Sequence, residues 1–169
     1  KWDVRQERLQ AIEDENLQLG MFIHYVKRKM IMFFFDDFAE CWEISRKAEE
    51  VVEYGMGTMY VSEHYFFWCL AATALYPEGT AAARRDYTRV IKKCLKKYRR
   101  WSRSCPENFL HKLLLMRAEW ARVRGKKDLA ARRYHEALVS ARESDCVHNV
   151  GLTGELAARF YFSIGYEEI

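Results

Sequence analysis

Proline and glycine are scarce in this chain, with 2 Pro and 8 Gly among 169 residues. Their scarcity excludes a turn-rich β sandwich and a long disordered linker, because both of these depend on such residues. Hydrophobic residues make up 50% of the chain and aromatic residues 15%, enough for an ordered core. At roughly 100–200 residues per domain, we expect a single domain over residues 1–169.

Long hydrophobic runs are also missing. The densest run, residues 30–35, stops at Asp36 and is far shorter than the roughly 18 residues that a membrane-spanning helix needs. The first three residues lack the basic and apolar parts of a signal peptide. We therefore expect a protein without a membrane span.

The cysteines show no pattern of metal or disulfide chemistry. Their number is odd and no two stand in a C-x-x-C spacing, which argues against a zinc cluster and a disulfide framework. Free cysteines with apolar neighbours suit a reducing compartment, so we expect a cytoplasmic protein in which they are small core residues. The five are Cys41, Cys69, Cys94, Cys105 and Cys146.

Motifs for catalysis and cofactor binding are missing as well. The chain contains no H-E-x-x-H, no G-x-x-x-x-G-K-[ST] and no G-x-G-x-x-G. His64 lies in the aromatic stretch VSEHYFFWCL and is better explained by packing than by a role as base or ligand. A solvated helix surface explains the other acids and bases. The sequence therefore predicts that this segment is not an enzyme and holds no cofactor and no metal ion.

Helical periodicity is what the chain does contain. From residue 106 to 124, apolar residues recur mainly three and four positions apart, as on one buried helix face. Pro106 suits a first helical turn, and Gly125 can end the helix in a left-handed conformation. Asp128 then favours the positive N-terminal end of a second helix over residues 127–144.

The same helix–turn–helix pattern recurs along the chain. Turns near residues 36, 78, 125 and 165 are about 40–47 residues apart, in the range of helical repeat arrays. We predict an all-α fold of seven or eight antiparallel helices. Its hairpins are expected over about 17–54, 58–102 and 106–144, with a partial one at 149–169 whose helix covers 151–164 and a further helix at 4–15.

The stretch AEWARVRGKKDLAARRYHEAL resembles a tetratricopeptide repeat. Ala118 matches the small residue in that family's first helix, and Gly125 matches its turn. Ala130, Tyr134 and Ala137 match the small, aromatic and small residues of its second helix. The resemblance implies a right-handed superhelix of helical hairpins that binds other proteins.

Two further stretches resemble parts of the same repeat. LAARFYFSIG is similar to another first helix, with Ala158, Tyr161 and Gly165 in the corresponding places, and DDFAECWEISRKA is a degraded match. The usual proline after the second helix is absent, and the period exceeds the family's 34 residues. We therefore interpret the chain as a tetratricopeptide-like variant.

A narrower resemblance covers most of residues 17–169. CPENFLHKLLLMRAEWARVRGKKDLAARRYHEALVSARES, followed by ELAARFYFSIG, is similar to the helical region of very large bacterial signalling proteins. Those proteins join a kinase-like domain, an ATPase module, this helical region and a sensor histidine kinase. The resemblance implies a regulatory segment of a two-component signal-transduction protein, and we expect the chain to be a fragment of such a protein.

Charge is distributed unevenly along the chain. Residues 84–103 hold ten basic side chains and one acid, Asp86, whereas residues 1–83 carry a net charge of −6. Like charges one helical turn apart, such as Lys92 and Lys96, each destabilise a helix by roughly 0.2–0.5 kcal/mol. Basic amphipathic helices bind nucleic acid, anionic lipid or acidic proteins, although this one could also be a solvated outer face.

The sequence leaves three functions open. The leading one is a protein-binding regulatory segment, and the alternatives are a nucleic-acid-binding repeat that uses the basic helix 84–103 and a sensor that holds a small ligand in its groove. We expect contacts on that helix and on exposed aromatic residues of helix 58–76. The candidate residues are Arg85, Lys92, Lys93, Lys96, Lys97, Arg100, Trp101, Tyr65 and Trp68.

Overall fold

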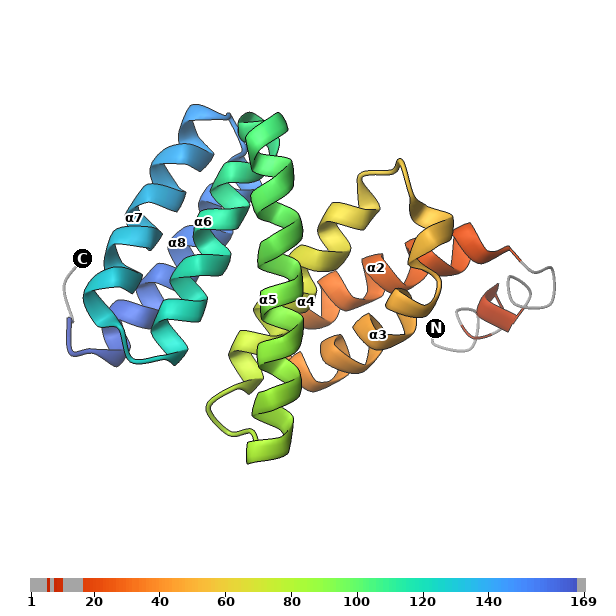
Figure 1. The fold of residues 1–169 in the computed structure, drawn as a ribbon, viewed down its shortest axis with the longest axis horizontal. Coiled ribbons are helices and arrows are strands. Elements are labelled where there is room, and N and C mark those ends of the chain that lie inside the picture. The colour runs from red at the N-terminus through yellow and green to blue at the C-terminus, as the bar shows by residue number, and fades with distance from the viewer. Residues whose placement is uncertain (1–5, 7, 11–16, 167–169) are drawn as a thin grey trace. The chain divides into compact units, whose positions relative to one another are not determined.

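The computed structural model describes residues 6, 8–10 and 17–166, and these contain helices but no strands. The all-α prediction is therefore confirmed. Residues 6 and 8–10 are helical, while the rest of the helix predicted over 4–15 lies outside the described residues. The elements are α2 (Gln18–Phe34), α3 (Phe38–Glu50), the 3-10 helix η1 (Val52–Gly55), α4 (Tyr60–Leu75), α5 (Ala81–Ser104), α6 (Pro106–Val123), α7 (Lys127–Glu143) and α8 (Val147–Ser163) (Figure 1).

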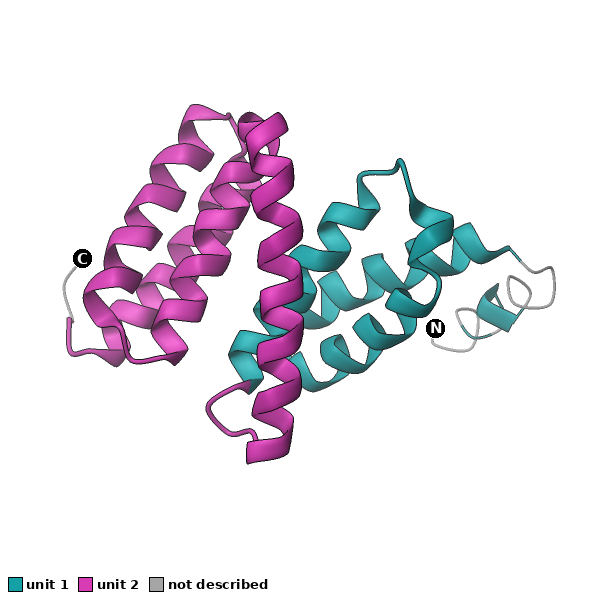
Figure 2. Ribbon diagram, viewed as in Figure 1, with its two compact units in different colours: residues 1–75 teal, residues 76–169 magenta. Residues whose placement is uncertain are grey.

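The chain divides into two compact units, residues 1–75 and residues 76–169 (Figure 2). The boundary falls inside the hairpin predicted over residues 58–102. That hairpin and the single domain predicted over residues 1–169 therefore remain predictions. No described helix is both long and apolar enough to span a bilayer.

Unit 1 begins with an antiparallel hairpin of α2 and α3, whose turn lies where two aspartates break the helical pattern. Asp36 has a left-handed backbone with φ 58°, a conformation that aspartate tolerates better than most residues. Asp37 caps α3, because its carboxylate accepts a hydrogen bond from the backbone N–H of Glu40 at 3.0 Å. The predicted break at residues 36–37 is confirmed.

The second turn of unit 1 depends on a glycine. α3 ends at Glu50, four residues before the predicted end, because Val51 leaves helical geometry and the chain continues as η1. A Cβ atom on Gly55 would lie 2.1 Å from the ring of Phe22, which is fully buried. Only glycine therefore allows η1 to pack this closely against α2.

α4 is buried almost all round. Its buried residues include both apolar side chains and His64, so the helix has no broad polar face. Tyr65 and Trp68 are only 2% and 5% exposed. The prediction that these two aromatic residues are exposed for binding was therefore wrong. A helix that is apolar all round is packed on several sides, and its sequence gives no indication of an outer face.

Unit 2 contains the hairpin of α6 and α7 that resembles the repeat. Ala118, Ala130 and Ala137 are fully buried, and Tyr134 is 1% exposed. Gly125 ends α6 with φ 69°, and the N–H of Lys126 donates to the carbonyl of Ala121 at 3.0 Å. These small residues let the two helices approach closely, and the turn satisfies carbonyls at the end of α6.

α8 completes unit 2 and packs against α7, where the rings of Tyr134 and Phe160 lie 5.2 Å apart. It begins at Val147, four residues before the predicted Gly151, because Asp145 takes the left-handed turn conformation with φ 52°. Ala158 and Tyr161 are half-buried on α8. Gly165 follows the helix with φ 90°.

Candidate protein-interaction surface

α5 presents opposite faces of different chemistry. Thr80 caps its start by accepting a hydrogen bond from the N–H of Ala83 at 3.2 Å. Ile91, Cys94 and Tyr98, spaced three and four residues apart, are fully buried. That apolar stripe fixes which side of the helix faces inward, so the many basic side chains are left on the outer side.

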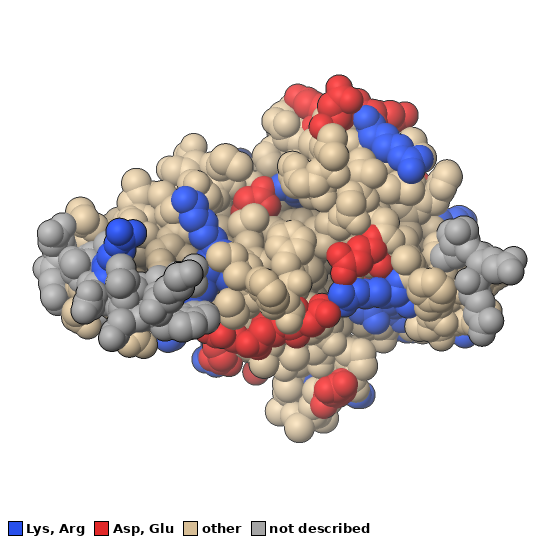
Figure 3. Space-filling view, turned by 180° about the vertical axis from the view of Figure 1, so that it is seen from behind, with Lys and Arg blue, Asp and Glu red and all other residues tan. Residues whose placement is uncertain are grey.

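The basic residues predicted for binding lie on this outer side. Lys97 is half-buried and the other five are exposed. Asp86, the acid within residues 84–103, pairs with Arg89 at 3.1 Å, whereas the same residues include ten basic side chains. On the opposite face of the molecule, shown in Figure 3, groups of basic side chains lie beside groups of acidic ones. The five exposed residues are Arg85, Lys92, Lys93, Lys96 and Arg100.

The aromatic residues predicted for binding pack against other side chains. Trp101 is half-buried, and its ring lies 5.2 Å from that of Tyr98 and 5.7 Å from that of Phe109. It therefore helps to join α5 to α6. Tyr65 donates its hydroxyl to Glu49 at 3.3 Å, and the Trp68 ring lies 5.2 Å from His64.

The positive charge continues from α5 onto α6 and α7. Burial is the largest cause that lowers the pKa of Arg117 below its ordinary value, and the nearby cations Arg133 and Arg99 lower it further, while Glu136 opposes the shift. The three guanidinium groups come from three different helices. Sequence reasoning missed Arg99, Arg117 and Arg133 because the packing of the helices, not their spacing in the chain, brings them near one another.

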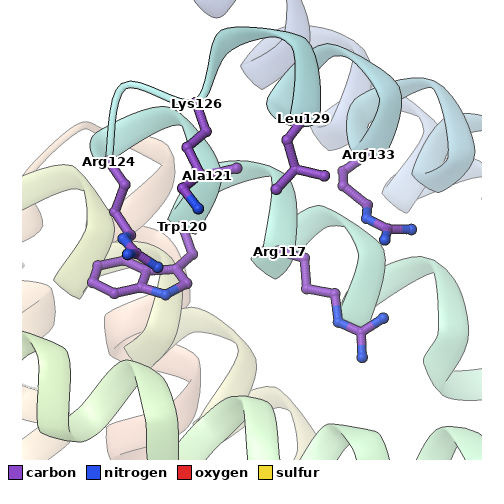
Figure 4. A pocket seen from close by; sticks show the side chains of 7 residues that line it. All are labelled: Arg117, Trp120, Ala121, Arg124, Lys126, Leu129 and Arg133. Atoms are coloured by element: carbon purple, nitrogen blue, oxygen red, sulfur yellow. The ribbon is translucent and has the colours of Figure 1, made fainter.

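A hollow of about 170 Å³ lies at the end of the α6–α7 hairpin. Figure 4 shows that Arg117 and Arg133 point to the same side of the two helices, and that Arg124 lies against the indole ring of Trp120. The guanidinium carbon of Arg124 is 5.5 Å from the ring centre, within the range of a cation–π contact. The hollow is lined by Arg117, Trp120, Ala121, Arg124, Lys126, Leu129 and Arg133.

The charges around this hollow are unbalanced. None of the described residues that line it is acidic, and four of the seven are basic. Arg133 pairs with Glu136, which lies one turn further along α7. Among the described residues, no carboxylate lies within ion-pair distance of Arg117, Arg124 or Lys126. The residues around the hollow therefore carry an excess of positive charge.

Unit 1 contains a cluster of buried polar groups. In unit 1, Lys29 and His64 are fully buried, with Lys29 Nζ 2.6 Å from His64 Nδ1, and His64 Nε2 lies 2.9 Å from Glu49. Burial raises the pKa of Cys41 to about 12, so its thiol stays protonated and unreactive. Among the described residues, no group of three potential ligands could hold a metal ion.

The comparison with protein families agrees with the architecture of the hairpins. No curated protein and no solved structure matches the sequence significantly. A family described as "CHK1-like, TPR repeats", in which TPR stands for tetratricopeptide repeat, matches residues 6–165. Repeats of this kind leave a surface for docking between stacked hairpins. Because the match covers nearly the whole sequence, this chain belongs to the CHK1-like family of TPR repeats.

Proposed function

We propose that this chain is a non-catalytic protein-interaction segment that binds an acidic stretch of a partner protein. Its contact surface, called the basic face below, lies on unit 2. The observation that carries the proposal is the excess of basic over acidic residues on α5, where residues 84–103 contain ten basic residues and one acid, Asp86. The basic face consists of Arg85, Lys92, Lys93, Lys96, Lys97, Arg99 and Arg100 on α5 together with Arg117, Arg124, Lys126 and Arg133.

Excess charge of one sign favours association with an oppositely charged partner. Like charges one turn apart on α5 repel one another, and an acidic partner removes that repulsion on binding. Complementary charge also speeds the encounter and selects against partners of the same sign. An acidic peptide segment therefore fits the basic face better than an apolar helix does.

The proposed setting is a multidomain bacterial sensor kinase in the cytoplasm. There the segment would relay or scaffold signals between an ATPase-like module and a sensor histidine kinase. The support is the resemblance of the α6–α7 hairpin and α8 to the helical region of such proteins. Any binding of ATP would belong to the other domains of that protein.

The two alternative functions find less support. A reader of single-stranded nucleic acid uses exposed aromatic rings on which bases stack. Here Tyr65 and Trp68 are buried, and Trp101 packs on Phe109. A site for a whole small molecule is usually about 300–1,000 Å³, whereas the hollow at Trp120 is about 170 Å³.

Charge reversal on α5 tests the proposal. The variant carries Lys93→Glu, Lys96→Glu and Lys97→Glu, and the probe is a fluorescent peptide rich in Glu and Asp. We expect unchanged helical content and a loss of affinity of about tenfold to a hundredfold, because each exposed charge pair contributes roughly 0.2–1 kcal/mol and reversal turns attraction into repulsion. Fluorescence anisotropy at 100 mM salt measures the affinity.

A second triple variant serves as the control. Lys27→Glu, Arg46→Glu and Lys47→Glu change the net charge equally, but on exposed residues of unit 1. We expect this variant to bind the peptide within about threefold of the unchanged protein. Equal binding by both variants would place the contact elsewhere. If the protein instead prefers duplex DNA, with an affinity that falls steeply with salt, the nucleic-acid alternative is correct.

A further inference from the structure

The outward side of α5 carries a straight row of basic side chains, called the basic row below. Its six residues follow one another at steps of four, three, four, three and four residues, so five steps cover 18 residues, or one helical turn each. A row with one residue per turn runs parallel to the helix axis. Ile91, Cys94 and Tyr98 are buried on the opposite side of the helix. The row is fully exposed and consists of Arg85, Arg89, Lys92, Lys96, Arg99 and Arg103.

Positive charge dominates the exposed surface of this helix. Over residues 84–103, all of which the structure describes, every exposed residue except Asp86 is a lysine or an arginine. Asp86 pairs with Arg89 at 3.1 Å, and among the described residues no carboxylate pairs with Lys92 or Lys96. An apolar helix or a stack of nucleic-acid bases needs exposed apolar or aromatic side chains, which this range lacks. An occupant of the row is therefore held by its negative charge.

The spacing of the basic row selects the shape of that occupant. At a rise of about 1.5 Å per residue, its neighbours are about 5.4 Å apart along the axis and the whole row is about 27 Å long. Acidic side chains on one face of a helix repeat at the same distance, so they stay in step with the row over its full length. On one face of an extended chain the repeat is roughly 6.4–6.8 Å, and five steps would overshoot the row by about 6 Å.

A helical partner also begins with its charges in place. A helix holds its carboxylates on one face before it binds, whereas a flexible acidic chain loses conformational freedom when it is ordered on the surface. Carboxylates one turn apart repel one another, as the cations of α5 do, and pairing the two faces relieves both repulsions. The two faces are therefore complementary in charge and in spacing.

We propose that the acidic stretch of the partner is a helix that lies along α5 and presents Glu or Asp, three and four residues apart, to the basic row. The proposal rests on the proposed function, because it specifies the shape of the acidic stretch that the basic face binds. A second row flanks the first on one side, so each carboxylate can approach cations of both rows. The second row consists of Lys93, Lys97 and Arg100.

A pair of peptides tests the spacing. Both have the same composition in an alanine-rich host and the same helical content by circular dichroism. One places its glutamates on one face at the steps of the basic row, and the other distributes them evenly around the helix. We expect the one-faced peptide to bind about tenfold more tightly, because several weak ion pairs then form in register at once. Fluorescence anisotropy measures both affinities at the same salt concentration.

Charge exchange between protein and peptide tests the helical shape directly. Lys92→Glu and Arg103→Glu should each weaken binding of the one-faced peptide severalfold, and a Glu→Lys change at the facing peptide position should restore it. The two protein residues are 11 positions apart on α5, or about 16 Å. The two restoring positions should therefore be about 11 residues apart in a helical peptide, but only about five apart in an extended one.

The control is Arg142→Glu, which changes an exposed residue of α7 outside the basic row and should leave the affinity unchanged. If both peptides bind equally and depend on Lys93, Lys96 and Lys97, or if the restoring positions are about five apart, the interaction surface stands and the helical partner is wrong. If neither peptide binds, both proposals are wrong. Duplex DNA that binds more tightly than the one-faced peptide would overturn a protein partner.

Discussion

In each of the two units, a glutamate carboxylate and a tyrosine hydroxyl link neighbouring helices. A basic side chain completes each network, but it is a lysine from another helix in unit 1 and an arginine from the same helix as the glutamate in unit 2. In unit 1, Glu49 of α3 accepts from Tyr65 and contacts His64, which in turn contacts the buried Lys29 of α2. In unit 2, Glu119 of α6 is 3% exposed and accepts from Arg122, a neighbour on its own helix, and from Tyr134 of α7. The first network joins three helices, and the second joins two.

The two units use different side chains to fill and link the space between their helices. In unit 2 the large Tyr134 fills the space between the helices, and burial together with the Glu119 carboxylate raises the pKa of its hydroxyl above the ordinary value. In the stretch DDFAECWEISRKA of unit 1, Ser45 takes the place of Tyr134, because it follows Cys41 by four residues as Tyr134 follows Ala130. The small Ser45 donates its hydroxyl to the carbonyl of Cys41 at 2.8 Å. Unit 1 relies instead on an ammonium, whose donors bind the ring and the carbonyl of His64.

The identity of the protonated nitrogens in unit 1 follows from this arrangement. A lysine ammonium can only donate, so Nδ1 of His64 must accept from Lys29. Nε2 therefore carries the proton and donates to Glu49 at 2.9 Å. His64 thus links the buried Lys29 to the Glu49 carboxylate. Its ring is fully buried, which explains why a histidine in an aromatic stretch has a structural role here.

The largest expected effect on stability comes from substituting Tyr134, the aromatic residue between α6 and α7 of unit 2. Tyr134→Ala should lower the free energy of unfolding of unit 2 by about 3–5 kcal/mol, because it opens a cavity between α6 and α7 and also removes a partner of the buried Glu119. Tyr134→Phe keeps the ring and should lose about 1.5–3 kcal/mol, as expected for a hydrogen bond to a charged group. Urea unfolding and hydrogen exchange of α7 amides measure both losses.

The control for this prediction is an aromatic residue in a less critical position. Tyr161→Ala removes a half-buried ring from α8 and should destabilise unit 2 less than Tyr134→Ala does. Equal losses for the two tyrosines would contradict the view that the position of Tyr134 between the helices is special.

The next largest expected effect on stability comes from substituting Lys29, the buried lysine of unit 1. Lys29→Ala should lower the free energy of unfolding by about 2–4 kcal/mol, because it leaves a cavity and leaves Nδ1 and the carbonyl of His64 without their donor. Lys29→Met keeps most of the volume and should lose less. Lys27→Ala, which truncates an exposed lysine of the same helix, should change little. If Lys29→Met proves more stable than the unchanged protein, the cost of burying the ammonium exceeds its bonds.

A smaller effect sharpens the contrast between tight and open positions in the two units. Gly55→Ala should destabilise unit 1 by about 1–3 kcal/mol, because the new methyl group would overlap the buried ring of Phe22. Gly151→Ala in α8 meets no atom within 4 Å and should stabilise unit 2 by about 0.5–1 kcal/mol, as alanine favours a helix. Thermal unfolding followed by circular dichroism measures both changes in stability. Two changes of the same sign would contradict the structure.

The sequence predicts the helices because periodicity and turn residues are local signals. The turns at Asp36 and Gly125 lie where predicted, and the left-handed conformations at both explain why those residues stand there. The start of α8 was missed because the turn at Asp145 lacks a glycine. Tyr65 and Trp68 were misjudged because α4 has no polar face from which an outer side could be read.

The candidate site was predictable only in part. The basic side chains of α5 stand out in the sequence, because ten of them fall within 20 residues. The hollow at Trp120 does not stand out, because it joins Arg117 and Arg124 of the first helix to Lys126 and Arg133 beyond the turn. These residues carry no common motif. Only the packing of α6 against α7 shows that they share one small cavity.

The smallest expected effect concerns a second buried histidine, which has no carboxylate partner. His111 of α6 is 2% exposed, and its Nε2 accepts from the amide of Asn149 on α8 at 3.0 Å. The same amide lies 3.0 Å from His148, and among the described atoms Nδ1 of His111 has no hydrogen-bond partner. Burial is the main cause that lowers the pKa of His111 to about 4, with Lys112 and His148 adding to the shift.

The contrast with His64 predicts how stability depends on pH. Because the pKa of His111 is lower in the folded chain than its ordinary value of 6.5, the unfolded chain takes up a proton first as the pH falls. The contribution of His111 is therefore complete above pH 6.5 and is lost between pH 6.5 and about 4. We expect the melting temperature of the unchanged protein to exceed that of His111→Leu by a few degrees more at pH 7 than at pH 5. The control is His135→Gln, which changes an exposed histidine of α7. If this variant showed the same pH-dependent difference in melting temperature, burial of His111 could not be the cause.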